Sequence, residues 1–267
     1  MAELVPDPTC RHAGVVRVGG TDQSYVDLDD PTHLEFDYLI RIADHLDTWA
    51  PAGQRLRVIH VGGAGMSLAR YLAHTRPHSP QIVLEPDEDL TAWVRQALPL
   101  PLHSGIKVRG VDGRAGMAVM PSGYADVVIV DAFAANQVPS SLVSREFFDQ
   151  VKRVLHSDGL LVMNVCDHRD LHCSRRLVAT LASGFSQLTL SAAPGTFRGR
   201  AFGNMVVAAS ERPHEVDVLR RHAAADTFPY RVLDDEETRR FSGGAAGFTD
   251  LDAVPSPAPP LQLTWFD

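Results

Sequence analysis

The segment that most constrains the fold spans residues 57–65, an apolar run that ends in three glycines around one alanine (Arg-Val-Ile-His-Val-Gly-Gly-Ala-Gly). A second apolar run follows it and ends at Glu85. Strand, glycine turn, helix, strand and acid is the order in which α/β nucleotide-binding sheets begin. The glycines let the backbone approach a ligand, and a carboxylate at this place can hold ribose hydroxyls. The segment therefore predicts an α/β sheet with a ligand site at the carboxyl ends of its strands.

Alternating strand and helix patterns continue along the chain. The run 125–131 is apolar on both faces, which is typical of a central parallel strand. Two later segments, 185–190 and 204–209, indicate a closing antiparallel pair, so the alternation favours a three-layer α/β sandwich. The expected strands are 56–61, 81–85, 106–111, 126–131 and 159–165, and the expected helices are 66–75, 88–97, 114–120, 144–155 and 170–182.

The first 50 residues have a different pattern. Residues 15–28 predict two short strands around a Gly19-Gly20 turn. The sequence Asp30-Pro31 then predicts the start of a helix, because proline suits a first helical turn. Apolar residues at helical spacing share one face of that helix: Leu34, Tyr38, Ile42 and Leu46.

Composition excludes several classes of function. The formal net charge is −8 and no basic run is longer than two residues, which argues against nucleic acid as a partner. No stretch approaches the roughly 18 apolar residues of a membrane span. The first residues lack a basic-then-apolar signal pattern, so we expect a cytoplasmic protein with no membrane partner. Three scattered cysteines predict reduced thiols rather than disulfides.

Two further acids, Asp112 and Asp131, follow the third and fourth expected strands, so three successive strands end in carboxylates on one rim. The third glycine of a dinucleotide fingerprint is replaced by Leu68, and no P-loop lysine is present, which weakens nicotinamide and triphosphate interpretations. A tight turn without any ligand stays open as an alternative. Soft ligands cluster at residues 166–173, but no second pair with zinc-finger spacing occurs, so no metal is expected.

An ordered set of motifs then resembles the spermidine synthases and their methyltransferase-fold relatives, over about residues 23–209. The resemblance implies a Rossmann-like seven-stranded methyltransferase sheet with a small N-terminal β-hairpin element. It also implies a donor that is S-adenosylmethionine or its decarboxylated form. The segments that carry it are 58–65, 83–87, 110–114, 128–131 and 144–155.

On this resemblance the chain divides into three segments. Residues 1–50 would form the N-terminal hairpin and helix, and residues 51–210 the S-adenosylmethionine-binding domain. Residues 211–267 would form a helical, proline-rich tail of the same domain.

The resemblance also assigns roles to individual positions. Asp131 would be the catalytic aspartate that helps to deprotonate the attacking amine. Gln23 and Tyr25 fall near the substrate gate of the family. The residues expected to bind the donor are Gly62, Gly63 and Gly65 at its methionine-derived portion, Glu85 at the ribose, and Asp112 with Gly113 at the adenine.

Two positions depart from the family pattern. Aminopropyltransferases carry one acid where this chain has Ala64 and a second where it has Ala134. A dicationic diamine needs paired carboxylates, because an unpaired buried charge costs several kcal/mol. The departures favour methyl transfer from S-adenosylmethionine to a small-molecule acceptor with Asp131 as base. A polyamine aminopropyltransferase that uses decarboxylated donor, and a non-catalytic relative, stay open as alternatives. Family members often form dimers, so a homodimer is possible, and the acceptor could be an amine.

Overall fold

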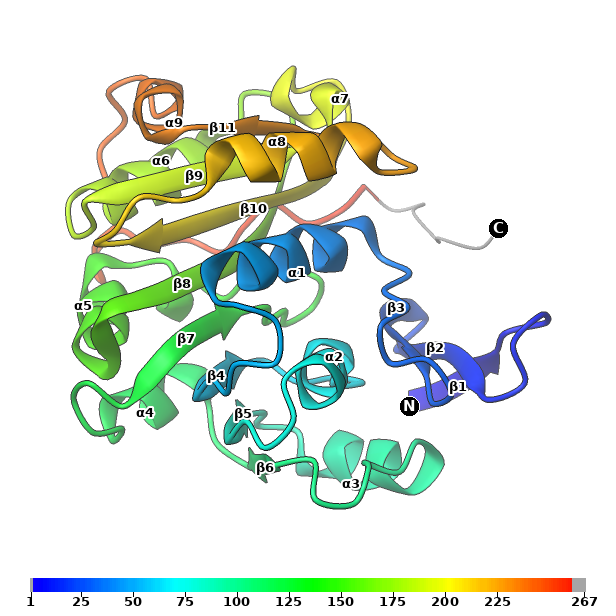
Figure 1. The fold of residues 1–267 in the computed structure, drawn as a ribbon. Helices are drawn as coiled ribbons and strands as arrows, with labels where there is room; N and C mark the ends of the chain where they lie inside the picture. The colour runs from blue at the N-terminus through cyan, green and yellow to red at the C-terminus, as the bar shows by residue number, and fades with distance from the viewer. Residues whose placement is uncertain (1, 261–267) are drawn as a thin grey trace.

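The computed structural model describes residues 2–260, in which two separate sheets form (Figure 1). Met1 and residues 261–267, the ends of the first and last predicted segments, lie outside the described residues. The larger sheet has eight strands in the order β11-β9-β10-β8-β7-β4-β5-β6. The smaller sheet has the order β1-β2-β3.

The larger sheet has a parallel part and an antiparallel part. The strands β4 to β8 pair in parallel, whereas β10 runs antiparallel between β8 and β9. This confirms the predicted Rossmann-like sheet. The strands are β4 (Val58–Val61), β5 (Gln81–Leu84), β6 (Ile106–Arg109), β7 (Ala125–Val130), β8 (Leu155–Asp167), β9 (Gln187–Ala192), β10 (Gly203–Ser210) and β11 (Arg231–Leu233).

An eighth strand, β11, extends the seven that were expected. It pairs with β9 and lies within the segment predicted to be helical and turn-rich. Its three residues are too few to give a strand pattern, so the exposed edge of β9 decides this pairing. A short helix, α7 (Pro194–Phe197), likewise forms where a loop was expected.

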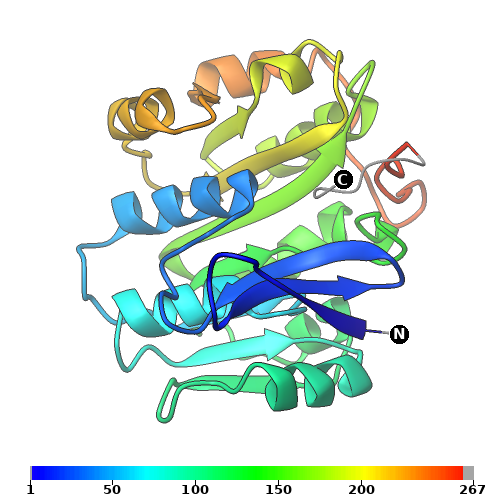
Figure 2. The same ribbon diagram turned by 90° about the vertical axis from the view of Figure 1, so that its right-hand side faces the viewer.

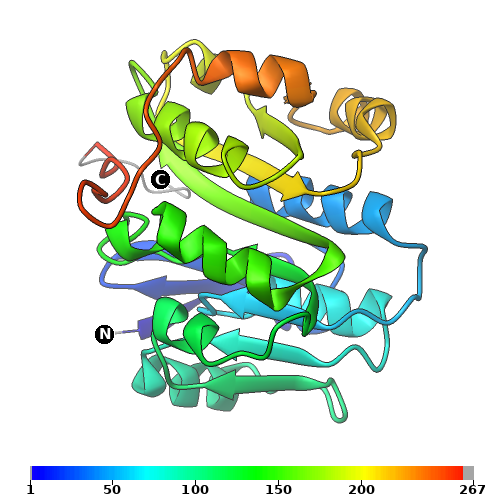
Figure 3. The ribbon, with the colours of Figure 1, turned by 90° about the vertical axis from the view of Figure 1, so that its left-hand side faces the viewer.

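Helices cover both faces of the sheet (Figures 2 and 3). The first face carries α1 (Asp37–Trp49), α2 (Ser67–Thr75), α3 (Glu88–Ala97) and α8 (Val216–Ala225). The second face carries α4 (Gly113–Ala118), η1 (Ser140–Leu142), α5 (Arg145–Val154), α6 (His172–Ala182) and α9 (Asp235–Phe241).

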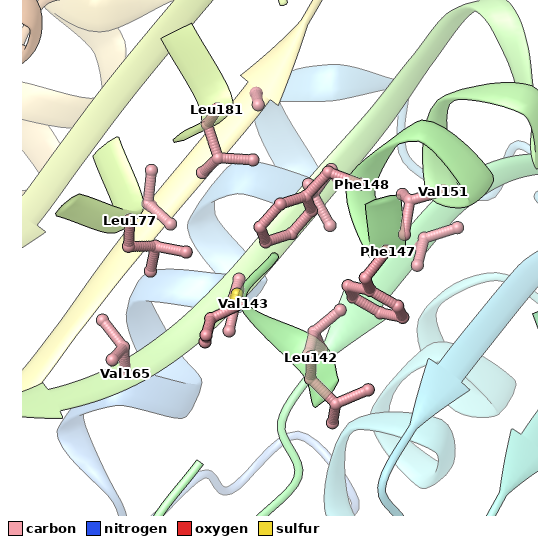
Figure 4. Close-up of a cluster of buried hydrophobic side chains, with 14 of the residues drawn as sticks. Leu142, Val143, Phe147, Phe148, Val151, Val165, Leu177 and Leu181 are labelled. Atoms are coloured by element: carbon pink, nitrogen blue, oxygen red, sulfur yellow. The ribbon is translucent and has the colours of Figure 1, made fainter. Parts of the chain in front are cut away.

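Strand β7 joins the two hydrophobic layers. Val127 and Ile129 pack with α1 and α2, while Val128 and Val130 pack on the opposite face, and all four are buried. This is the pattern of a central parallel strand that is covered on both sides. In the second layer, side chains of α5 and α6 gather over β8 (Figure 4).

The smaller sheet contains β1 (Ala2–Pro6), β2 (Ala13–Val18) and β3 (Thr21–Asp27). The predicted hairpin is present as β2 and β3, and β1 adds a third antiparallel strand. Val16 and Val26 pack against Met66 and Val94, so this sheet is attached to the first face beside the glycine turn.

The first helix begins seven residues later than the Asp30 start predicted for it, at Asp37. The Asp27 carboxylate accepts hydrogen bonds from the backbone of Asp29 and Asp30, and the Asp30 carboxylate accepts from Thr32. Such local side-chain bonds offer the backbone an alternative to helix. They hold residues 28–32 outside a helix, in bends and turns.

Candidate active site

A cavity of about 510 Å³ opens at the carboxyl ends of the parallel strands, beside the smaller sheet. Its size falls within the usual range of small-molecule sites. The walls come from the glycine turn, the ends of β5, β6 and β7, the first turn of α1 and the β2–β3 hairpin. Of the predicted site residues, those that line it are Gln23, Gly62, Gly63, Glu85, Asp112, Gly113 and Asp131.

The glycine turn lets several backbone segments approach one another. Gly62 has φ +94°, and a Cβ there would lie 2.2 Å from the carbonyl oxygen of Asp131. A Cβ on Gly63 would lie 2.7 Å from Cγ1 of Val83. Both glycines are therefore needed to bring the end of β4 against its neighbours.

Gly65 has a different place from the one expected. It lies outside the lining of the cavity, and its N–H donates to Oγ of Ser24 at 3.0 Å. A Cβ on Gly65 would lie 2.7 Å from Cβ of Ser24. Its lack of a side chain thus serves the packing of the smaller sheet onto the turn.

Glu85 is held beneath the glycine turn by two backbone donors. Its Oε2 accepts the N–H of Gly63 at 3.0 Å, and its Oε1 accepts the N–H of Asp87 at 3.0 Å. The carboxylate is thereby fixed in orientation at the cavity wall. This geometry leaves lone pairs that could accept from a ribose diol.

Asp112 combines a cavity position with a structural role. It is the N-cap of α4, and its Oδ1 accepts the N–H groups of Arg114 and Ala115 at 2.9 and 3.1 Å. Helix capping by aspartate stabilises by about 1 kcal/mol. Capping therefore accounts for an acid here with or without a ligand. Gly113 lies against β4, since its Cβ would be 2.3 Å from Cγ1 of Val61.

Asp131 lies at the end of β7 and accepts two hydrogen bonds. Tyr38 Oη donates to its Oδ2 at 3.2 Å, and Asn164 Nδ2 donates to its Oδ1 at 3.0 Å. Burial raises the pKa of Asp131 to about 6, although both donors lower it. Burial and the adjacent Asp131 also raise the pKa of Tyr38 well above its usual range. A carboxylate with this pKa is suited to accept a proton near neutral pH.

Both partners of Asp131 were absent from the sequence-based prediction. Tyr38 had been interpreted as part of an apolar helix face, yet its hydroxyl reaches across to β7. Asn164 is fully buried and is the one polar residue in the run 160–165 of β8, and that polar residue was the available signal. Val130 pairs with Met163, so the next residues along the two strands, Asp131 and Asn164, become neighbours.

The rim of the cavity is bridged by hydrogen bonds. The Gln23 amide donates to Oδ1 of Asn136 at 3.3 Å, and the Asn136 amide donates to Oγ1 of Thr21 at 3.0 Å. These bonds connect the β2–β3 hairpin with the loop that follows β7. Gln23 thus lines the cavity, and its role at a substrate gate stays a prediction.

Tyr25 does not line this cavity, contrary to the prediction. Its ring is buried, and its hydroxyl donates to the carboxylate of Asp7 at 3.0 Å. The pairing of β2 with β3 shifts register at Gln23, because Val16 pairs with Ser24 while Arg17 pairs with Asp22. This bulge reverses the alternation of side chains, so that Ser24 instead of Tyr25 lines the cavity.

The cysteine and histidine side chains of residues 166–173 do not converge on a common point that could hold a metal. Cys166 is buried and its thiol donates to Oδ1 of Asn204 at 3.1 Å, and burial raises the pKa of Cys166. Within residues 2–260, no three His, Cys, Asp or Glu side chains are grouped so that they could hold a metal ion. No helix in that same range is long and apolar enough to cross a membrane.

The strand order, with an acid-lined cavity at the carboxyl ends, defines a Rossmann-like protein of the methyltransferase type. No family model matches the chain. The chain is 28% identical over 167 residues to a polyamine aminopropyltransferase of Chromobacterium violaceum, and this covers 61% of the chain and 62% of that relative. It is 26% identical over 207 residues to one of Neisseria meningitidis, which covers 76% and 75% respectively.

A solved structure matches over nearly the whole length. It is that of a probable spermidine synthase from Corynebacterium glutamicum, with a TM-score of 0.88 and 28% identity, covering 97% of this chain and 95% of the other. In sequence and in fold the chain is thus similar to polyamine aminopropyltransferases and to a probable spermidine synthase.

Proposed function

We propose that the chain is an aminopropyltransferase, which moves the aminopropyl group of decarboxylated S-adenosylmethionine to an amine. The observation that carries this proposal is the half-buried Asp131 carboxylate, held by Tyr38 and Asn164 at the wall of the cavity. The similarity to polyamine aminopropyltransferases supports aminopropyl transfer over the methyl transfer that the sequence favoured.

In this proposal the acids at the carboxyl ends of the strands have different roles. Glu85 would accept hydrogen bonds from the ribose hydroxyls, and Asp112 would lie beside the adenine. The sulfonium of the donor would then point along the glycine turn toward Asp131. In-line positioning of the two reactants supplies most of the rate enhancement that such a transfer needs.

The transfer step needs one base, the Asp131 carboxylate. The lone pair of the acceptor nitrogen forms a bond to the propyl carbon next to sulfur. The carbon–sulfur bond breaks, and its electron pair stays on sulfur as the neutral thioether of methylthioadenosine. One N–H proton of the acceptor goes to the Asp131 carboxylate, whose pKa of about 6 leaves it ionised at neutral pH.

Methyl transfer from intact S-adenosylmethionine is the second candidate. It is favoured by Ala64, which leaves the glycine turn without an acid that would repel the carboxylate of that donor. Incubation with each donor and a panel of amines separates the two functions. Methylthioadenosine is the expected product, whereas S-adenosylhomocysteine would establish methyl transfer instead. Calorimetric titration with both donors is the matching measurement of binding, and binding of intact S-adenosylmethionine alone would contradict the proposal.

A further inference from the structure

The charges around Asp131 restrict which amine the site can accept. Four carboxylates line the cavity within the described residues: Asp131, Glu85, Asp87 and Asp112. Strand β4 separates Asp131 from the other three, which follow β5 and β6. With strands about 4.8 Å apart, the backbone of these acids lies about 10 Å or more from the backbone of Asp131. Asp131 is therefore the one carboxylate on its side of the described cavity.

Among the described residues, the part of the cavity lining beside Asp131 is uncharged. The loop that follows it contributes Ala132, Phe133, Ala134 and Ala135 to the lining, and the first turn of α1 contributes Leu39. Beyond them, the amides of Gln23 and Asn136 bridge the rim. No lysine or arginine is among the described lining residues.

On the acceptor's side of the cavity, the lining beside Asp131 can balance the charge of the reacting amine but not a second positive charge at the far end of the acceptor. An ammonium beside Asp131 gains an ion pair, in addition to the two neutral donors already present. A second ammonium a few carbons away would lose its water against alanine and phenylalanine side chains. An unpaired charge in such a place costs several kcal/mol.

Resting on the proposed function, we propose that the acceptor is a primary monoamine whose far end is uncharged, and not an α,ω-diamine. Alkyl groups fit the alanine and phenylalanine side chains, and a neutral hydroxyl or amide could bond to Gln23 or Asn136. A negatively charged tail is excluded by the same lining, because it offers no cation to such a group.

The first test compares amines of equal length in the methylthioadenosine-release assay with decarboxylated donor: 1-aminobutane, 4-aminobutan-1-ol and 1,4-diaminobutane. We expect kcat/KM for both monoamines to exceed that for the diamine by at least tenfold at pH 8. An equal or higher kcat/KM for the diamine would overturn the inference and leave the proposed function intact. Release from none of the amines would overturn the proposed function itself, and the inference with it.

A charge swap at Ala134 provides the second test. The Ala134→Asp variant places a carboxylate three residues after Asp131, and Ala134→Asn adds nearly the same volume without charge. We expect the ratio of diamine to monoamine kcat/KM to rise at least tenfold in Ala134→Asp relative to Ala134→Asn. Calorimetric titration of each amine into protein saturated with methylthioadenosine should show the same shift in Kd. A ratio that is equal in the two variants would mean that the far end of the acceptor does not meet this loop.

Discussion

Replacing Asp131 by asparagine should stabilise the ligand-free protein at pH 8 while abolishing transfer. Burial raises the pKa of this carboxyl from 3.8 to about 6 in the folded state. At about 1.4 kcal/mol for each pH unit, the ionised form carries up to about 3 kcal/mol of unfavourable free energy. Asparagine is nearly isosteric and can keep both bonds, accepting from Asn164 and donating to Tyr38. Since water can enter the cavity, we expect a gain of about 1–3 kcal/mol.

The sign of the pH dependence follows from proton binding. Between pH 4 and 6 the folded state holds the Asp131 proton more tightly than the unfolded state does, so wild-type stability falls as the pH rises through this window. The advantage of Asp131→Asn is therefore absent below about pH 3.8, near half of its full value at pH 5 and complete above pH 7.

Urea unfolding at pH 5 and pH 8 measures this advantage. Asp149→Asn is the matched control, because it makes the same chemical change on the exposed face of α5 and should alter stability by no more than about 0.5 kcal/mol. If Asp131→Asn were no more stable than wild type at pH 8, or if its gain did not shrink at pH 5, the buried-carboxylate argument would be refuted. Retention of wild-type turnover would independently remove Asp131 as the base.

Three further predictions concern the neighbours of this carboxylate and the donor side. Tyr38→Phe removes a hydrogen-bond donor that lowers the pKa of Asp131, so the acidic limb of the rate–pH profile should move to higher pH. An acidic limb at the wild-type position would argue against this contact in solution. Gly62→Ala should lower the free energy of unfolding in urea by at least about 2 kcal/mol, because the new Cβ would meet the Asp131 carbonyl. The control Gly19→Ala, which also has a positive φ but open space around it, should lower it by only about 1 kcal/mol. Equal losses in the two variants would contradict the steric argument. Glu85→Gln should weaken donor binding in calorimetry by about 10- to 100-fold through loss of a charged acceptor, and an unchanged Kd would show that Glu85 does not hold the ribose.

Much of the fold could be predicted because its signals are local. The helix expected at 88–97 coincides with α3, and the expected strand at 81–85 differs from β5 by one residue. Apolar periodicity and glycine spacing determine such elements from neighbours in the chain. The start of α1 and the strand β11 were missed, because Asx-type turns and the free edge of β9 override the local pattern.

The candidate site likewise has features that local sequence predicts and features that only the tertiary structure determines. The sequence by itself determined that acids end three successive strands, and that glycines precede the first of them, because the carboxyl ends of parallel strands must meet at one rim. Only the tertiary structure decided that Tyr38 and Asn164 hold Asp131, since their contact depends on strand register and on helix placement over 93 and 33 residues of separation. It also decided that Tyr25 turns away, because a single bulge at Gln23 reverses the side-chain alternation.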